Sequence, residues 1–135
     1  MVRAGMGSPL SRRPRVLIVD DEVLIGRVLA RALGQFAEVE VAKSGAEALD
    51  AMARARATGA GDESFDLVIC DVMMPEMSGP ALLDHVKAHH PAEAGAFVFV
   101  TGGASPEEQE KIEGTGAPCM QKPLDVEAIR ALLHR

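Results

Sequence analysis

Carboxylates gather at the ends of apolar runs in this chain, and they are the side chains best placed to do chemistry. The apolar run 16–19 ends in the acidic pair Asp20 and Asp21, and the run 67–70 ends in Asp71. In open parallel α/β sheets, ligands bind at the edge formed by the carboxyl ends of the strands. Three carboxylates at that edge repel one another unless a cation neutralises them, and oxygen ligands of this kind suit Mg²⁺. The sequence therefore predicts a Mg²⁺ site at Asp20, Asp21 and Asp71.

Two further polar groups follow apolar segments in the same way. Thr101 ends the run 97–100, and Lys122 ends the segment 117–121. An ammonium group suits a phosphoryl oxygen, or a carboxylate in its absence. A hydroxyl and an ammonium beside three carboxylates therefore suggest phosphoryl chemistry.

Each of these residues also has an ordinary interpretation when it is considered alone. Asp20 and Asp21 could cap the helix that follows them, and Thr101 could cap another. Lys122 could be a solvated surface lysine. We prefer the functional interpretation because all of these groups fall at strand ends of one predicted sheet.

Apolar runs alternate with helical patterns along the chain, which predicts βα units around a parallel sheet. The expected strands cover about 15–20, 38–42, 66–70, 96–100 and 117–121. The expected helices cover about 22–34, 44–57, 79–90, 105–113 and 125–133. Only 38–42 alternates cleanly, so it is expected at an edge of the sheet. The predicted fold class is α/β, a doubly wound (βα)5 three-layer sandwich with a five-stranded parallel sheet.

Two of these helices are expected to pack differently. The helix over 22–34 places Ile25, Val28, Leu29 and Leu33, with Ala32, on one face, and we expect that face to point into the core. The helix that starts near Ser105 has one large apolar residue, so we expect it to be short or weakly held.

Length and composition narrow the classes of protein. A chain of 135 residues with 47% hydrophobic and 25% charged residues suits one globular domain. We expect residues 14–135 to form that domain and residues 1–13 to be a disordered or linker tail. The net charge of −6 argues against direct binding of nucleic acid, and no apolar run is long enough for membrane insertion. Cys70 and Cys119 lack metal-site spacing, which favours a reduced, cytoplasmic protein.

The string around Asp71 matches a known family pattern. Asp71 is followed by two residues, Met-Pro, one residue, Met77, one residue and Gly79, and Lys122 is followed by Pro123. This resembles the receiver domain of two-component response regulators over nearly the whole chain. The resemblance implies a flavodoxin-like fold and a signalling domain that catalyses only its own phosphorylation and dephosphorylation.

The resemblance also assigns roles to single residues. Asp71 would accept a phosphoryl group, and the backbone carbonyl of Met73 would complete the Mg²⁺ shell of Asp20, Asp21 and Asp71. Thr101, the Gly102 amide and Lys122 would bind the phosphoryl group, with Thr101 moving on phosphorylation. Pro75, Gly79 and Pro123 would shape the turns, and the Lys122–Pro123 bond would be cis.

The implied partner is a sensor histidine kinase or a histidine phosphotransfer domain, and the implied state is a monomer or weak dimer. The chain could stand alone or be the terminal receiver of a hybrid histidine kinase. One position departs from the family: Cys119 stands where an aromatic residue usually helps Thr101 to switch. We therefore expect the segment 102–116 to respond to phosphorylation instead.

Two alternatives stay open from the sequence. A phosphatase of the haloacid dehalogenase type also uses a strand-end Asp with Mg²⁺, but it needs a carboxylate where Met73 stands. The second alternative is a degenerate receiver that serves only as a binding scaffold. The intact acidic residues and Lys122 argue against it.

Overall fold

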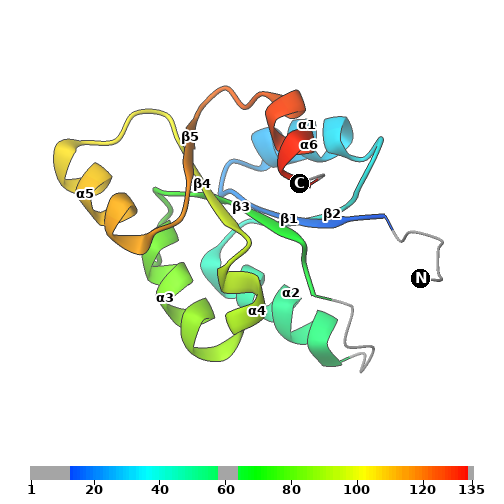
Figure 1. Cartoon of the computed structure of the whole chain (residues 1–135), viewed down its shortest axis with the longest axis horizontal. Coiled ribbons are helices and arrows are strands. Elements are labelled where there is room, and N and C mark those ends of the chain that lie inside the picture. The colour runs from blue at the N-terminus through cyan, green and yellow to red at the C-terminus, as the bar shows by residue number, and fades with distance from the viewer. Residues whose placement is uncertain (1–12, 58–63, 134–135) are drawn as a thin grey trace.

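Five parallel strands form one sheet at the centre of this computed structural model, which describes residues 13–57 and 64–133. The predicted tail, except for Arg13, and residues 58–63 and 134–135 lie outside the described residues. The strands are β1 (Arg15–Val19), β2 (Glu38–Ala42), β3 (Leu67–Asp71), β4 (Phe97–Thr101) and β5 (Cys119–Gln121). Their order in the sheet is β2-β1-β3-β4-β5 (Figure 1). The predicted α/β fold and the edge position of β2 are confirmed.

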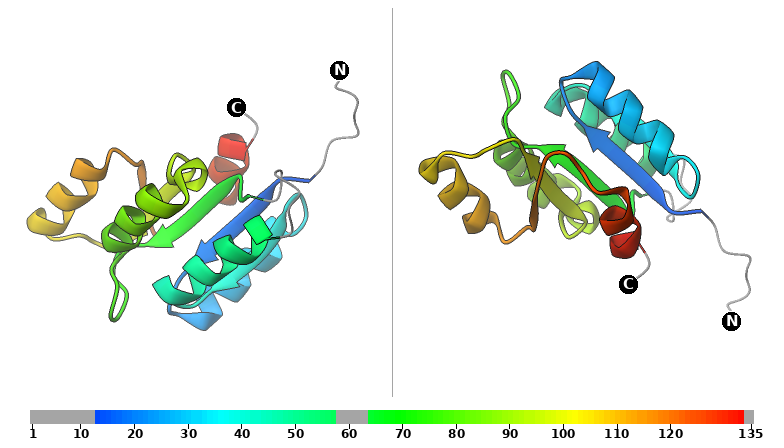
Figure 2. Two further views of the ribbon diagram at one scale, coloured as in Figure 1. Left: turned by 90° about the horizontal axis from the view of Figure 1, so that it is seen from below. Right: turned by 90° about the horizontal axis from the view of Figure 1, so that it is seen from above.

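Helices cover both faces of the sheet (Figures 1 and 2). They are α1 (Val23–Leu33), α2 (Gly45–Ala57), α3 (Gly79–His89), α4 (Pro91–Ala94), α5 (Pro106–Thr115) and α6 (Val126–Leu133). Helices α1 and α6 lie on one face, and α2, α3 and α5 lie on the other. The short helix α4 was not predicted: Pro91 ends α3 but also occupies the first turn of a new helix, where proline is tolerated.

The core consists of two apolar clusters, one on each side of the sheet. Strands β3 and β4 are buried along their whole length, so their side chains supply both clusters. Fully buried strands of this kind read as continuous apolar runs, because helices cover both of their faces. This packing holds the carboxyl ends of β1, β3 and β4 side by side.

Polar side chains define where the helices begin. Ser105 and Glu108 form a reciprocal capping box at α5, and the Ser78 hydroxyl accepts a hydrogen bond from the Ala81 N–H at α3. The Ser44 hydroxyl likewise accepts from the Glu47 N–H. These caps satisfy N–H groups that the first helical turn leaves without partners.

The predicted inward face of α1 is only partly correct. Leu29 and Leu33 are buried, but Ile25 is 37% exposed and Val28 is 70% exposed. Helix α6 has eight residues, and its Arg130 guanidinium lies over the Phe36 ring, just beyond the end of α1. We attribute the exposure to this placement, because α6 contacts the chain at the far end of α1 and leaves the first turns of α1 uncovered.

None of the helices in residues 13–57 and 64–133 has the length and apolar character needed to cross a membrane.

Candidate functional site

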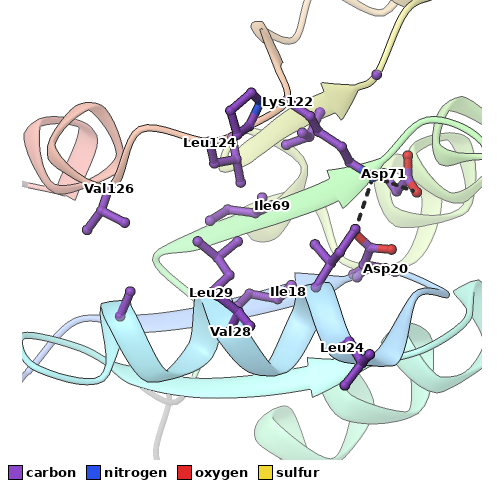
Figure 3. A pocket seen from close by; sticks show the side chains of 16 residues that line it. Ile18, Asp20, Leu24, Val28, Leu29, Ile69, Asp71, Lys122, Leu124 and Val126 are labelled. Atoms are coloured by element: carbon purple, nitrogen blue, oxygen red, sulfur yellow. Dashed lines mark ion pairs between the residues drawn. The ribbon is translucent and has the colours of Figure 1, made fainter.

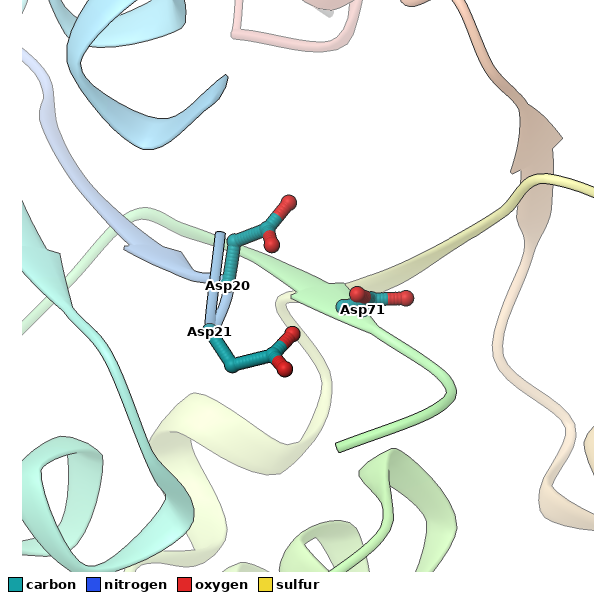
Figure 4. A group of neighbouring side chains, drawn as sticks. All are labelled: Asp20, Asp21 and Asp71. Carbon is teal, nitrogen blue, oxygen red and sulfur yellow. The ribbon is translucent and has the colours of Figure 1, made fainter. Parts of the chain in front are cut away.

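The three predicted carboxylates come together at one edge of the sheet. Val19 and Cys70 are register partners in β1 and β3, so the next residues, Asp20 and Asp71, lie beside each other. Asp20, Asp21 and Asp71 each offer an oxygen, and these oxygens lie within 4.8 Å of one another (Figure 4). Asp20 and Asp71 are buried, whereas Asp21 is exposed. A donor set made only of oxygen fits a small, hard cation.

Lys122 reaches this cluster from the end of β5. Its Nζ lies 3.5 Å from Asp20 Oδ2 and 3.5 Å from Asp71 Oδ2 (dashed lines in Figure 3). Its backbone N–H donates to the Thr101 carbonyl at 2.9 Å, which fixes the start of the side chain next to β4. Lys122 is therefore an ion-pair partner of the buried carboxylates and not a solvated surface lysine.

The sequence analysis missed a fourth carboxylate in this network. Glu22 Oε1 lies 3.6 Å from Lys122 Nζ, although the Glu22 side chain is 60% exposed. An exposed pair of this kind contributes little to stability. The uninterrupted acidic run of Asp20, Asp21 and Glu22 was the available signal.

Burial and charge shift the ionisation of the site in opposite directions. Burial raises the pKa of Asp71, and the neighbouring Asp20 charge adds to this, while Lys122 and the Met73 N–H oppose it without cancelling it. Burial alone would lower the pKa of Lys122, but attraction to Asp71, Asp20 and Glu22 outweighs it and the pKa is raised. The Lys122 ammonium therefore stays charged, whereas the Asp71 carboxylate is destabilised in its ionised form.

The capping interpretation of Asp20 and Asp21 is wrong. Glu22 is the N-cap residue of α1, and its side chain makes no capping hydrogen bond. Asp20 Oδ1 instead accepts from the Glu22 N–H at 2.9 Å, which holds the carboxylate in a tight turn after β1. The geometry orients Asp20 toward Lys122 and the cluster.

Thr101 and Gly102 lie at the same edge. Val100 is the register partner of Asp71, so Thr101 is the next residue along the neighbouring strand. Thr101 is buried, and its hydroxyl accepts from the Gly103 N–H at 3.2 Å. Ser105 caps α5, so the capping interpretation of Thr101 is also wrong. Gly102 is exposed, and a Cβ added there would meet nothing within 4 Å.

The loop after Asp71 is folded tightly against the Asp71 side chain. The Met73 N–H donates to Asp71 Oδ1 at 3.3 Å, while the Met73 side chain is 57% exposed. Met74 and Met77 pack against the core.

Gly79 closes this loop. Its N–H donates to the Val72 carbonyl at 2.9 Å, and a Cβ at Gly79 would lie 2.5 Å from the Asp71 carbonyl oxygen and 2.9 Å from the Phe99 ring. Only glycine allows the first turn of α3 to come this close to the end of β3. Across the site, the Lys122–Pro123 bond is cis, as the family resemblance implied.

Both cysteines are free thiols. Cys70 is buried in β3, and Cys119 is partly buried against the core. Burial raises the pKa of each thiol, and for Cys70 the nearby Asp71 charge adds to it. Neither is therefore an activated nucleophile.

Comparison with known proteins decides the family. The family model described as "Response regulator receiver domain" matches residues 16–134. The chain belongs to the response regulator receiver family. Its function is therefore that of a two-component signal receiver, a signalling domain.

Several receiver relatives resemble this chain. The chain is 34% identical over 122 residues to transcriptional regulatory protein ZraR of Escherichia coli, covering 89% of this chain and 25% of ZraR. It is 41% identical over 96 residues to sensor kinase CckA of Brucella abortus, covering 70% of this chain and 9% of CckA. The solved structure of chemotaxis protein CheY4 of Vibrio cholerae matches with 30% identity and a TM-score of 0.75, covering 92% of this chain and 98% of that one.

The receiver is a small part of the curated relatives. The chain spans a quarter of the length of ZraR and also of a probable cyclic di-GMP phosphodiesterase of Vibrio cholerae, with which it shares 29% identity over 120 residues. The match covers only that quarter of each relative, so the likeness concerns the receiver alone.

Proposed function

We propose that this receiver accepts a phosphoryl group on Asp71 from the phosphohistidine of a sensor histidine kinase or a histidine phosphotransfer domain. One observation carries the proposal: Asp71 Oδ2 lies 3.5 Å from Lys122 Nζ, in a cluster whose three carboxylates converge within 4.8 Å. A carboxylate between a cation site and a fixed ammonium suits attack on phosphorus, because both positive groups offset the charge of the incoming phosphate.

We assign a Mg²⁺ site to Asp20, Asp21 and Asp71, with the Met73 backbone carbonyl as a further ligand. The convergent oxygens support this assignment, since Mg²⁺ is typically bound through one or two carboxylates together with water and phosphate oxygens. When bound, Mg²⁺ would screen the negative charge that the acceptor and the phosphate bring together.

In the transfer, an Asp71 carboxylate oxygen forms a bond to phosphorus while the bond from phosphorus to the histidine nitrogen breaks. The electron pair of that bond leaves with the imidazole. Lys122 then exchanges its Asp71 partner for a phosphoryl oxygen, and the Gly102 N–H and the Thr101 hydroxyl bind the same group. The Thr101 hydroxyl can donate to the phosphoryl group while it accepts from the Gly103 N–H, so its movement toward the phosphate would draw on the start of the segment 102–116.

The movement of Thr101 toward the phosphoryl group is our proposal for switching. Cys119 is smaller than the aromatic residue usual in the family, so the signal would pass from Thr101 mainly to the segment 102–116 and α5. We further propose that residues 14–135 act as one receiver domain after a tail or linker over 1–13, and that this domain is cytoplasmic, a monomer or weak dimer, and makes no direct contact with nucleic acid. The likeness to CckA supports a hybrid-kinase context, and the likeness to ZraR supports a response regulator context.

The first test is intact mass after incubation with Mg²⁺ and acetyl phosphate. We expect the wild-type chain to gain one phosphoryl group only when Mg²⁺ is present, and Asp71→Asn to gain none. Asp84→Asn, which removes an exposed carboxylate from α3, is the matched control and should behave as wild type. A gain that persists in Asp71→Asn or without Mg²⁺ would contradict the proposal. Steady release of phosphate from a phosphate ester would instead favour the phosphatase alternative.

A further inference from the structure

An apolar groove runs along the exposed face of α1. Its volume is about 580 Å³, which lies in the range of small-molecule sites. Leu24, Ile25 and Val28 line it from α1, and Leu124 and Val126 line it from the segment after β5 (Figure 3). Leu24 is 74% exposed and Val28 is 70% exposed, so the described structure leaves apolar surface open to solvent here. Large exposed apolar side chains in a contiguous patch mark binding surfaces.

The groove ends at the acceptor. Asp20, Asp71 and Lys122 are the charged side chains among the described residues that line it, and Gly102 also belongs to its wall. Lys122 and the carboxylates therefore form the polar end of the groove, and the exposed face of α1 forms its apolar wall. A ligand that matches both parts carries a phosphoryl group at one end and a hydrocarbon chain at the other.

We propose that the groove binds the acyl chain of a small-molecule phosphodonor, an acyl phosphate of a medium-chain carboxylic acid. The inference rests on the proposed phosphorylation of Asp71 and adds the class of donor. An Asp71 oxygen forms the bond to phosphorus, the bond from phosphorus to the bridging acyl oxygen breaks, and the electron pair leaves with the carboxylate. No proton or further reactant is needed.

The apolar wall should discriminate between donors by chain length. Each methylene that becomes fully buried is worth about a fourfold gain in binding. Acetyl phosphate has one methyl group and leaves the groove unfilled, whereas hexanoyl phosphate carries four more methylenes. Acetate and hexanoate are carboxylates of similar basicity, so the two donors have similar intrinsic reactivity and a difference in rate reports the groove.

The test compares the second-order rate constants for phosphorylation by hexanoyl phosphate and acetyl phosphate, followed by intact mass with Mg²⁺ present. We expect hexanoyl phosphate to react at least about tenfold faster, the gain from partial burial of its chain. Leu24→Gln and Val28→Gln should bring the ratio of the two rate constants close to one. Val23→Gln is the matched control, because Val23 is 48% exposed on α1 but does not line the groove, and it should keep the ratio.

Binding is measured separately with unreactive analogues. Hexylphosphonate should shift the methyl NMR signals of Leu24 and Val28, and methylphosphonate at the same concentration should leave them in place. Equal rate constants for the two donors, or a ratio that survives both groove variants, would overturn the inference while phosphorylation of Asp71 stands. Absence of Mg²⁺-dependent phosphorylation by either donor would overturn this inference together with the proposed function.

Discussion

The proposed chemistry requires an ionised Asp71 carboxylate, but the surroundings of Asp71 favour its protonated form. Burial and the Asp20 charge raise its pKa above the ordinary value of 3.8, and Lys122 opposes this only in part. A cation bound to the cluster would resolve the conflict, because it favours the charged form of every carboxylate that it contacts.

This conflict predicts a pH dependence of metal binding. Protons compete with Mg²⁺ for Asp71, so Mg²⁺ affinity should fall as the pH decreases, and the fall should begin at a higher pH than an ordinary aspartate would cause. Calorimetric titration at several pH values measures it, with the ¹³C shift of the Asp71 carboxyl group as an independent record. Asp71→Asn should bind Mg²⁺ more weakly and with a flatter pH profile. An identical profile in this variant would show that another group is responsible.

Most of the site residues could be predicted because they directly follow strands. A strand end fixes where the next side chain lies, so Asp20, Asp71, Thr101 and Lys122 could be placed from local apolar runs alone. Glu22 could not be placed in this way. Its contact with Lys122 depends on how far two flexible side chains reach across the site, and no local pattern reports such a distance.

Few groups hold α5 to the rest of the described structure. Ile112 is its one buried side chain, and the Lys87 ammonium donates to the Thr115 carbonyl at 3.3 Å. Because a single apolar contact anchors it, this helix suits a segment that responds to events at Thr101.

The weak hold predicts the effect of removing the anchor. Ile112→Ala should lower the free energy of unfolding by about 2–4 kcal/mol, since the residue is fully buried. Amide hydrogen exchange should rise in α5 well before it rises in the sheet. Leu83→Ala in α3, which is also fully buried, is the matched control and should increase exchange across the whole domain. Uniform exchange in Ile112→Ala would mean that α5 unfolds only with the rest.

For the helices and strands, sequence patterns predicted where each element lies along the chain better than which other elements it packs against. All five strands and the five long helices were foreseen, because strand runs and helix caps are local signals. The exposed face of α1 was not, because an amphipathic pattern shows which side is apolar but not whether another helix covers it. The cover depends on the length and direction of α6, which are properties of the packed molecule.

The molecule as a whole concentrates like charge at one end of its sheet. The chain has a net charge of −6, and three carboxylates, those of Asp20, Glu22 and Asp71, share Lys122 at the strand ends. Such clusters lower the free energy of unfolding in the absence of a cation, and natural domains are only marginally stable.

Removing one of these charges should therefore stabilise the metal-free domain. A carboxyl group with a raised pKa adds stability only while it is protonated, and that stability is lost as the pH rises through the folded pKa. At neutral pH, Asp71→Asn should raise the free energy of unfolding by about 1 kcal/mol, or roughly 3–5 °C in Tm. Lys122 keeps Asp20 and Glu22 as partners.

Thermal unfolding with and without Mg²⁺ measures this effect. The advantage of Asp71→Asn should shrink as Mg²⁺ is added, because the wild-type cluster then binds the cation. Asp84→Asn removes the same charge from the exposed surface of α3 and should leave Tm nearly unchanged. A lower Tm for metal-free Asp71→Asn would show that the Lys122 pair outweighs the repulsion.

The two glycines beside the acceptor have opposite consequences for mutational drift. At Gly79 a side chain would collide with the Asp71 backbone, so a random change there removes the protein by unfolding it. At Gly102 a side chain meets open space, so a change leaves a folded domain whose amide is harder for a phosphoryl oxygen to approach. A lineage that stops using the phosphate can therefore lose Gly102 silently, whereas Gly79 will persist for as long as the fold does.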